Sequence, residues 1–459
     1  MNEPFAINRR AALARMGAGM GTLGLFNSLQ AATGLAPHFA PRAKRVIHLF
    51  MNGGPFGPDF LDPKPALKKF EGQRPEGTDL RTERPTGGLL NAPYKYTRHG
   101  QSGLPVSELL PHTAKFADDL CVLRSVHTDN PNHGPALLLM NNGTMTPKVP
   151  SMGAWMSYGL GTQATDLPGF VVLNGGLVPS GGWDNFGNGF LPASHQATVF
   201  KAGKEPLADI RPREGRPGLQ QAKLGLLHKL DRGVLDRFGH VDELESAIAN
   251  YEMAYRMQSA VPELIDIKGE TAATRRLYGL EDKYEHTRTY GLQCLMARRL
   301  VEKGVRFIEL TCPRISGNDR WDAHGGLYKN HGDNARATDL PIAGLLRDLK
   351  SRGMLDETLV VWAGEFGRTP FAQGSNGRDH NPFGYTIWMA GGGAKPGIAY
   401  GATDEFGYHA VENKLEMHDM HATMLHLLGM DHEKMTYLFD GFDQRLTGVK
   451  GHVVDELVA

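Results

Sequence analysis

Two short segments place carboxylates and imidazoles at spacings that suit a metal ion. In the segment WDAH, Asp322 and His324 stand at positions i and i+2, which project to the same side of an extended chain. A carboxylate oxygen and an imidazole nitrogen in this arrangement can hold one divalent cation. The segment RDHNP offers His380 as a further ligand, with Asp379 as a partner that orients its ring. The alternatives are an Asp–His hydrogen bond in a solvated loop and ordinary turn chemistry.

Other charged residues are suited to binding a metal or an anionic substrate. Glu365 follows the apolar run VVWAG, and a carboxylate at the end of a buried strand needs a cation. That cation is either a metal ion or Arg368 in a salt bridge. His133 stands where a helix is expected to begin, a place where anions bind; capping or packing is the alternative. Arg368 and Arg378 are suited to binding the oxygens of an anion.

The elements that position these residues are apolar strands separated by helices. Near-continuous apolar strands that alternate with helices are typical of a parallel sheet covered on both faces. We therefore predict an α/β fold, doubly wound, with a mostly parallel sheet and helices on both faces. The expected strands are residues 45–51, 120–126, 170–173, 305–310, 358–362 and 385–389.

The predicted sheet brings the polar residues together at one edge. Ligands of open α/β sheets bind at the carboxyl ends of the strands. Asn52 and Asp59 follow the first expected strand, and His133 follows the second. Asp322 follows the fourth strand and Glu365 the fifth. The sequence thus predicts a site at this edge, with metal ligands and substrate-binding groups drawn from several loops.

Composition and the N-terminal segment restrict the class of function that we expect. Lysine and arginine total 50 and balance 50 acidic residues among 459, so nonspecific nucleic-acid binding, which needs a basic surplus, is not expected. Arg9 and Arg10, followed by a weakly apolar stretch and small residues, predict a twin-arginine export signal over residues 1–36. The expected partner is the export machinery, and the expected location is periplasmic or extracellular. No stable membrane span is expected unless this signal remains uncleaved.

The rest of the chain reads as one domain, residues 42–459. Residues from about 201 to 290 are charged and have helical periodicity, which predicts a helical insertion in that domain. Residues 71–105 are rich in Gly, Pro and charge and predict a long surface excursion.

Several segments, in order along the chain, resemble a known superfamily. The stretch DLPIAGLLRDLKSRGMLDETLVVWAGEFG (339–367) is similar to a conserved stretch of sulfatases in the alkaline-phosphatase superfamily. HDMHATMLHLLGMD (418–431) and HGPALLLMNNG (133–143) resemble two further sulfatase segments. More closely, the chain resembles the exported bacterial family called domain of unknown function 1501. The segments that carry this resemblance are GGPFGPDFLDPKP, PSMGAWMSYGLG, WDAH, GEFGRTP and GRDHNPFG.

The resemblance implies a changed active site. Asn52 falls where sulfatases have a metal-binding aspartate, and His133 falls at the cysteine that becomes formylglycine. Glu365 and Phe366 replace an Asp-His pair, so one metal ligand is lost. Asp322, together with His324, is similar to a compressed metal pair of the phosphatase branch, and His380 resembles a late histidine ligand of that branch. The resemblance implies one metal site at Asp322, His324 and His380, with a second remodelled around Asn52, Asp59 and Glu365 or lost.

We therefore expect an exported metal-dependent hydrolase that acts on sulfate or phosphate esters, either small molecules or polysaccharides. The histidine ligands favour Zn or Mn over Ca or Mg. His133 is expected to serve as nucleophile, general acid or further ligand. The main alternative is an exported binding or assembly protein that kept the fold and lost the chemistry. A phosphotransferase or isomerase is a further alternative.

Overall fold

The computed structural model describes residues 36–76, 81–201, 206–208, 210–211, 218–238, 242–313, 315 and 320–459. The expected export signal over residues 1–36, with Arg9 and Arg10, lies outside the described residues except for its last position. The prediction of this signal is therefore carried forward as a proposal.

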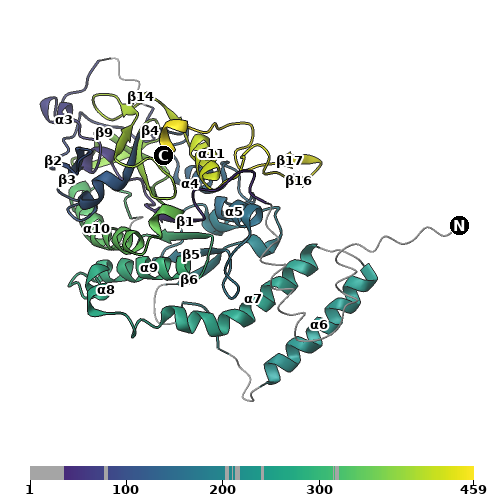
Figure 1. Ribbon diagram of the computed structural model, residues 1–459. Helices are drawn as coiled ribbons and strands as arrows, with labels where there is room; N and C mark the ends of the chain where they lie inside the picture. The colour runs from purple at the N-terminus through teal and green to yellow at the C-terminus, as the bar shows by residue number, and fades with distance from the viewer. Residues whose placement is uncertain are drawn as a thin grey trace.

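A nine-stranded sheet forms the centre of the molecule (Figure 1). All six expected strands are present in it, which confirms the predicted doubly wound α/β class. The strands pair in parallel except at β11, which runs antiparallel to both of its neighbours. In spatial order the strands are β12 (Ile398–Tyr400), β4 (Leu120–His127), β11 (Tyr385–Ala390), β8 (Thr358–Ala363), β1 (Arg45–Phe50), β7 (Phe307–Thr311), β5 (Phe170–Asn174) and β6 (Thr198–Lys201), with β15 (Leu415–Glu416) also paired to β4.

The reversed direction of β11 matters for the site. A strand that runs antiparallel starts at the edge where its parallel neighbours end. The segment that precedes β11 is the hairpin of β9 (Gly367–Gln373) and β10 (Gly377–Asn381), which connects it to the end of β8. His380 of β10 comes before β11 in the sequence. Because β11 runs antiparallel, His380 still lies at the carboxyl edge of the parallel strands.

Helices cover both faces of the sheet, because each central strand buries alternate side chains on opposite faces. Ile47 and Leu49 of β1 pack into one core cluster, and Val46 and Phe50 pack into the other. The first cluster includes residues of α9 (Glu285–Glu302) and α10 (Leu327–Ser351), with α8 (Ala272–Leu277) beside them. The second cluster is closed by α4 (His133–Asn142), α5 (Met152–Leu160) and α11 (Met417–Leu427).

Two long helices extend from the body in the lower part of Figure 1, α6 (Leu219–Phe238) and α7 (Asp242–Ile265). They lie in the range where the sequence predicts a helical insertion, and the division of the chain into domains remains a prediction. In the described part of the chain, the remaining α-helix is α3 (Pro65–Lys69), and three further hairpins are β2 (Tyr96–His99) with β3 (Leu104–Ser107), β13 (Ala402–Thr403) with β14 (Ala410–Glu412), and β16 (Tyr437–Phe439) with β17 (Phe442–Gln444).

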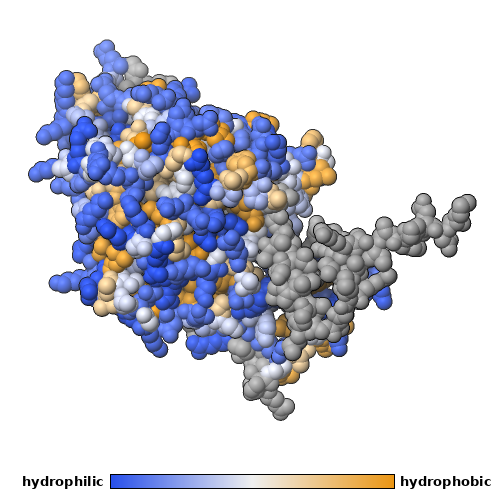
Figure 2. Space-filling model, in the orientation of Figure 1, coloured by the Kyte–Doolittle hydropathy of each residue, from blue (hydrophilic) through white to orange (hydrophobic). Residues whose placement is uncertain are grey.

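The surface in Figure 2 is mostly hydrophilic, with orange apolar residues gathered near the β16–β17 hairpin. Leu438 and Phe442 of this hairpin are 69% and 70% exposed. Among the described helices, none combines the length and the apolar composition that crossing a bilayer requires.

Candidate functional site

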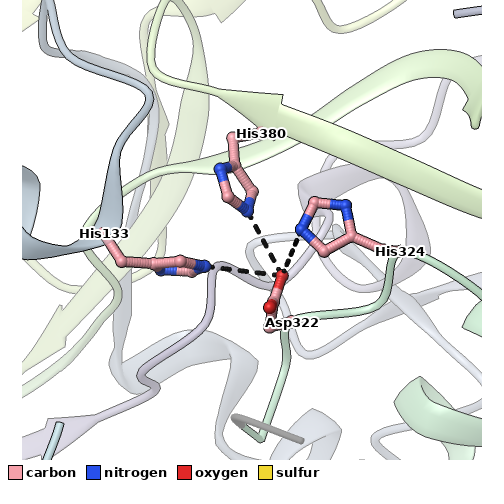
Figure 3. Close-up of side chains that lie close together, drawn as sticks. All are labelled: His133, Asp322, His324 and His380. Carbon is pink, nitrogen blue, oxygen red and sulfur yellow. Dashed lines mark hydrogen bonds and ion pairs between the residues drawn. The ribbon is translucent and has the colours of Figure 1, made fainter. Parts of the chain in front are cut away.

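Four side chains from three separate segments converge on one point (Figure 3). His133 is the first residue of α4, Asp322 and His324 precede α10, and His380 lies on β10. The Nε2 atoms of His133, His324 and His380 lie 3.4, 3.0 and 3.2 Å from the same atom, Asp322 Oδ1. The structure therefore brings together the three residues that the sequence predicted as a metal site, with His133 beside them.

Two glycines allow the supporting loops to approach this closely. Gly53, in the turn after β1, has φ +107°, and a Cβ there would clash with the backbone nitrogen of Asp322. A Cβ at Gly377, the first residue of β10, would overlap the carbonyl oxygen of His324. The turn after β1 and the β9–β10 hairpin thus enclose the Asp322–His324 loop from two directions.

The hydrogen bonds on the far side of each imidazole indicate where a proton lies. Each Nδ1 faces an oxygen that only accepts hydrogen bonds, so we assign a proton to Nδ1, and Nε2 of a neutral ring then keeps its lone pair. The three acceptors are Glu365 Oε1 at 2.7 Å from His133, Gln373 Oε1 at 2.5 Å from His324, and the Pro131 carbonyl oxygen at 2.7 Å from His380.

This arrangement fits a divalent cation. Three nitrogen lone pairs and one carboxylate oxygen face each other, and His133 Nε2 has no hydrogen-bond partner among the described residues. Such a set of electron-pair donors repels itself unless a proton or a metal ion lies between its members. Imidazole and carboxylate together suit Zn or Mn better than Ca or Mg. The donor set therefore fits the metal that the sequence predicts.

The pKa values of the site residues differ according to their partners. For His133, burial lowers the pKa, but the contacts with the carboxylates of Asp322 and Glu365 and their charges raise it to about 9. For His380, burial dominates and lowers the pKa to about 3. For Asp322, burial opposes ionisation, yet the three histidines and Arg368 hold its pKa well below the usual range. His380 is therefore neutral at pH 7, whereas His133 attracts a proton.

Arg368 supports the aspartate of the cluster. It is 1% exposed, and its Nη2 donates to Asp322 Oδ1 at 2.5 Å. Its other donors reach the carbonyl oxygens of Gly53, Gly54 and Arg378. All of these contacts orient Asp322 and fix the turn after β1. With its donors directed to the protein, Arg368 is placed for a supporting role, and the predicted contact with a substrate anion remains a prediction.

Arg378 was also predicted to bind a substrate anion, and the structure places it elsewhere. Its guanidinium is fully buried over the ring of Phe56, 3.9 Å from the ring centroid. It donates to the carbonyl oxygens of Thr369, Leu90 and Asn91. Burial lowers its pKa to about 10. These contacts connect the hairpin to the segment at residues 90–91 and direct the guanidinium to backbone carbonyl oxygens.

The three remaining predicted metal ligands, Glu365, Asn52 and Asp59, differ in how directly they contact the cluster. Glu365 is fully buried, accepts hydrogen bonds from the Gly53 N–H at 2.9 and 3.1 Å, and binds His133. Asn52 is 3% exposed, next to Gly53, and its Oδ1 lacks a partner among the described residues. Asp59 instead accepts a hydrogen bond from His331 Nδ1 at 2.7 Å. Glu365 is thus attached to the cluster directly, whereas Asp59 belongs to a separate buried pair.

Sequence reasoning missed three groups that contact the histidines. Gln373 and the Pro131 carbonyl hold two of the rings, and Glu83 Oε2 lies 2.9 Å from His380 Nδ1. Glu83 belongs to the expected surface excursion, which is anchored here by the Arg84 N–H donating to Asp379 Oδ2 at 2.7 Å. Asp379 therefore contacts this segment instead of the ring of His380. The sequence carries no periodic or motif signal that distinguishes Glu83 from its neighbours.

Comparison with known families assigns the chain. A family model described as "Protein of unknown function (DUF1501)" matches residues 43–458. The chain belongs to this family. The match covers the whole described sheet and every residue of the cluster, and it confirms the resemblance seen in the sequence. Among curated proteins, no relative of this DUF1501 chain is found.

Solved structures resemble the DUF1501 chain at low identity. A sulfatase from Pseudoalteromonas sp. is 13% identical, with 94% of this chain and 76% of that chain covered and a TM-score of 0.38. A phosphonate monoester hydrolase from Silicibacter pomeroyi is 13% identical, with coverages of 72% and 70% and a TM-score of 0.36. A lipoteichoic acid synthase from Listeria monocytogenes is 9% identical, with coverages of 93% and 80% and a TM-score of 0.35. These similarities concern the architecture alone.

Proposed function

We propose that this DUF1501 chain is a metal-dependent hydrolase of sulfate or phosphate esters. The observation that carries the proposal is the convergence of three imidazole Nε2 atoms on Asp322 Oδ1, with each Nδ1 already bonded to an acceptor. The side chains of His133, Asp322 and His324 are 16, 18 and 19% exposed, so a solute can reach the cluster. The substrate class follows the resemblance of the sequence to sulfatases.

Asp322, His324 and His380 would hold the ion. Catalytic zinc sites use three protein ligands and keep a further position open, which matches these three residues. A bound Zn or Mn ion polarises an ester oxygen and makes a water molecule more acidic. Arg368 orients Asp322, and the Pro131 carbonyl orients His380 so that its Nε2 lone pair faces the cluster.

We infer that His133 acts as a general acid and not as a fourth ligand. Its Nε2 lies farther from Asp322 Oδ1, at 3.4 Å, than the nitrogens of His324 and His380. Its Nδ1 donates to the buried carboxylate of Glu365, which orients the ring and stabilises the imidazolium form. A protonated histidine held by a carboxylate in this way gives its proton to the leaving group and regains one from the attacking water molecule.

The experiment measures metal and turnover together. We expect the purified chain to contain about one Zn or Mn per molecule by mass spectrometry, and the double variant Asp322→Ala, His324→Ala to lose it. Wild type should hydrolyse p-nitrophenyl sulfate or p-nitrophenyl phosphate. His133→Gln should keep the metal and lose at least about 100-fold in kcat.

Each other outcome rejects a specific part of the proposal. A wild type that binds no Zn, Mn, Ca or Mg rejects the metal site. Metal binding without turnover on a broad ester panel favours the non-catalytic binding or assembly alternative. Loss of metal in His133→Gln makes His133 a ligand and rejects its role as general acid.

We also propose that the protein is exported through the twin-arginine pathway. The support is the Arg9-Arg10 pair and the weakly apolar segment that follows it in the sequence. Cell fractionation should find wild type outside the cytoplasm and the variant Arg9→Lys, Arg10→Lys retained inside. Equal distributions of the two proteins would reject the proposed export route.

A further inference from the structure

The core contains a small cavity that is lined largely by methionine. It has a volume of about 20 Å³ and lies where β1, β8 and β11 meet the helices on one face of the sheet. Five of its ten lining residues are methionines, although the chain has only 18 methionines among 459 residues. They are Met140 of α4, Met152 of α5, and Met417, Met420 and Met424 of α11. Because methionine also fills irregular gaps in ordinary cores, the methionines alone make no site.

Two buried histidines line the same cavity, and each has a ring nitrogen left for a ligand. The Nε2 of His421, on α11, donates to the Met140 carbonyl oxygen at 2.8 Å. Burial lowers the pKa of His421 to about 4, so its ring is neutral and its Nδ1 carries a lone pair. This Nδ1 has no hydrogen-bond partner in the described part of the chain. The Nδ1 of His48, on β1, lies 3.3 Å from Glu309 Oε2, which leaves Nε2 as the nitrogen available to the cavity.

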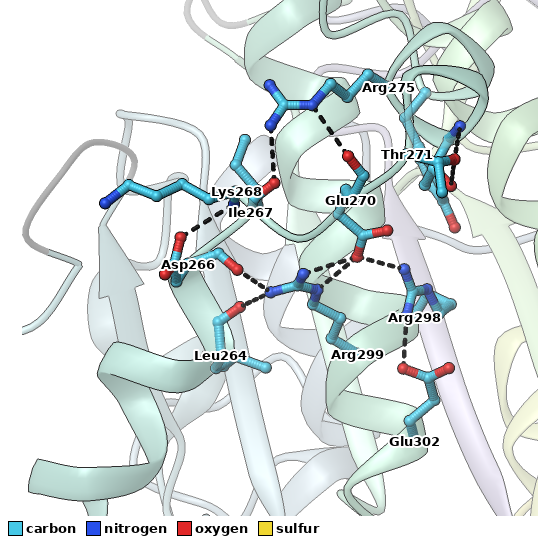
Figure 4. A network of polar contacts seen from close by, with 12 residues as sticks. Leu264, Asp266, Ile267, Lys268, Glu270, Thr271, Arg275, Arg298, Arg299 and Glu302 are labelled. Atoms are coloured by element: carbon cyan, nitrogen blue, oxygen red, sulfur yellow. Dashed lines mark hydrogen bonds and ion pairs between the residues drawn. The ribbon is translucent and has the colours of Figure 1, made fainter.

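Glu309 of β7 adds a negative charge beside this cavity. It is 1% exposed, its Oε1 has no hydrogen-bond partner among the described residues, and its ion pair there is with His48. The carboxylate of Glu270, in contrast, contacts two guanidinium groups, at 2.8 Å from Arg298 Nη2 and 2.7 Å from Arg299 Nη2 (Figure 4). A buried carboxylate without such compensation is costly. The charge of Glu309 is therefore balanced either by a protonated His48 or by a cation that His48 binds.

We propose that this cavity binds one Cu(I) ion. The ligands are His421 Nδ1, His48 Nε2 and methionine thioethers, chiefly those of Met420 and Met424, which share one side of α11 with His421. Soft thioether ligands favour Cu(I), and imidazole suits copper as well. The single positive charge of the ion balances the single carboxylate of Glu309 through His48. The volume of about 20 Å³ suits one small ion.

A water molecule is the competing occupant, and it fits the lining less well. A cavity of this size can also hold one water molecule, which typically makes about three hydrogen bonds to polar groups. In this lining only the two histidine side chains offer strong partners, because a thioether sulfur is a weak acceptor. A soft metal ion finds electron-pair donors in the methionines as well.

The cavity is separate from the cluster in Figure 3, so the two sites can be tested apart. Met140 comes seven residues after His133 on α4, which is about 10 Å along the helix axis. The variant Asp322→Ala, His324→Ala removes two residues of the cluster and serves as the background chain. Purified without oxygen from cells grown with added copper, the background chain should contain about one copper per molecule by mass spectrometry. The copper should resist removal by bicinchoninate, a chelator that is coloured when it binds Cu(I).

Two pairs of leucine substitutions in this background locate the ion. Met420→Leu, Met424→Leu conserves volume, so the chain should stay folded, and it should bind Cu(I) at least about 100-fold more weakly, as measured by competition with bicinchoninate. Met430→Leu, Met435→Leu is the matched control, because these methionines are equally buried in the same core cluster and do not line the cavity. The control should bind Cu(I) as the background does. Circular dichroism should give the same spectrum for both pairs.

The other outcomes overturn the proposal. A background chain without copper leaves water or methionine packing as the content of the cavity. Copper that wild type binds and the background loses belongs to the cluster in Figure 3. Equal affinities of the two leucine pairs place the ion elsewhere in the chain. Glu309→Gln should weaken Cu(I) binding about tenfold, and an unchanged affinity would reject the charge balance on which the choice of a monovalent ion depends.

Discussion

At the scale of single residues, the proposed chemistry depends on the proton of His133. The ring lies between two carboxylates, Asp322 on the Nε2 side and Glu365 on the Nδ1 side. Glu365 is fully buried and held by the Gly53 N–H. A carboxylate fixed in this way keeps the Nδ1 proton in place and favours the charged form of the ring. Asp322 and Glu365 together raise the pKa of His133 to about 9 despite burial.

Replacing Glu365 by glutamine tests whether its negative charge supports the role of His133. Glu365→Gln keeps an oxygen for the Nδ1 proton and removes the charge that stabilises the imidazolium. We expect kcat to fall about 10- to 100-fold with the metal content unchanged. Glu357→Gln, at an exposed salt bridge with Lys44, is the control and should retain full turnover. Loss of the metal in Glu365→Gln would show that Glu365 is a metal ligand, as the sequence predicted.

A second residue-scale prediction concerns Glu83. Its Oε2 lies 2.9 Å from His380 Nδ1, beside the Pro131 carbonyl that accepts the ring proton. The negative charge makes Nε2 a better electron-pair donor, so Glu83→Gln should weaken metal binding about tenfold. Competition with a coloured chelator measures the change. Glu76→Gln, an exposed site on the same excursion, should bind metal as wild type does. Equal affinities for the two variants would remove Glu83 from the site.

At the scale of elements, the sheet could be predicted because its strands are apolar on both faces. All six expected strands form, and β1 and β8 differ from their predicted ends by one residue at most. The antiparallel direction of β11 was not predictable, because an apolar strand has the same composition in either direction. This direction is nevertheless what brings His380 to the site. Local patterning thus identified the strands, and the topology decided which loops meet.

The same distinction between local patterns and topology explains which residues of the site could be predicted. Asp322, His324 and His380 were predicted because short spacing and polar loops after strands are visible in a sequence. The groups that hold their rings, Gln373 and the Pro131 carbonyl, are contacts between distant segments and leave no local pattern. Arg378 shows the reverse case, and its predicted contact with a substrate anion stays a prediction. Its sequence neighbours suggested a substrate contact, but its side chain turns inward to backbone carbonyl oxygens.

Gly377 gives a prediction at this scale. The hairpin approaches the Asp322–His324 loop so closely that any Cβ at Gly377 overlaps the His324 carbonyl oxygen. Gly377→Ala should displace the loop and lower metal occupancy by at least about tenfold while the sheet stays folded. Gly325→Ala is the control, because a Cβ there meets open space next to the same histidine. Metal analysis and circular dichroism check both variants. Full occupancy in Gly377→Ala would mean that the loop tolerates the shift.

At the scale of the whole molecule, buried histidines make stability depend on pH. His421 of α11 is 1% exposed and lines a cavity of about 20 Å³ together with His48 and several methionines. Its Nε2 donates to the Met140 carbonyl oxygen at 2.8 Å. The rest of the ring has mostly apolar surroundings. Burial lowers the pKa of His421 to about 4, while the unfolded chain keeps the ordinary value of 6.5.

The sign of the effect follows from proton binding. Between pH 6.5 and 4 the unfolded chain binds a proton at this position and the folded chain does not, so acid favours unfolding. The stabilisation is fully present above pH 6.5 and falls by about 2 kcal/mol by pH 5 from this histidine alone. Urea unfolding at pH 7 and pH 5 should show this loss in wild type and a smaller loss in His421→Leu. His426→Leu, five residues later on the same helix and only half-buried, should keep the wild-type dependence. If His421→Leu and wild type lose equal stability, the acid sensitivity originates elsewhere in the core.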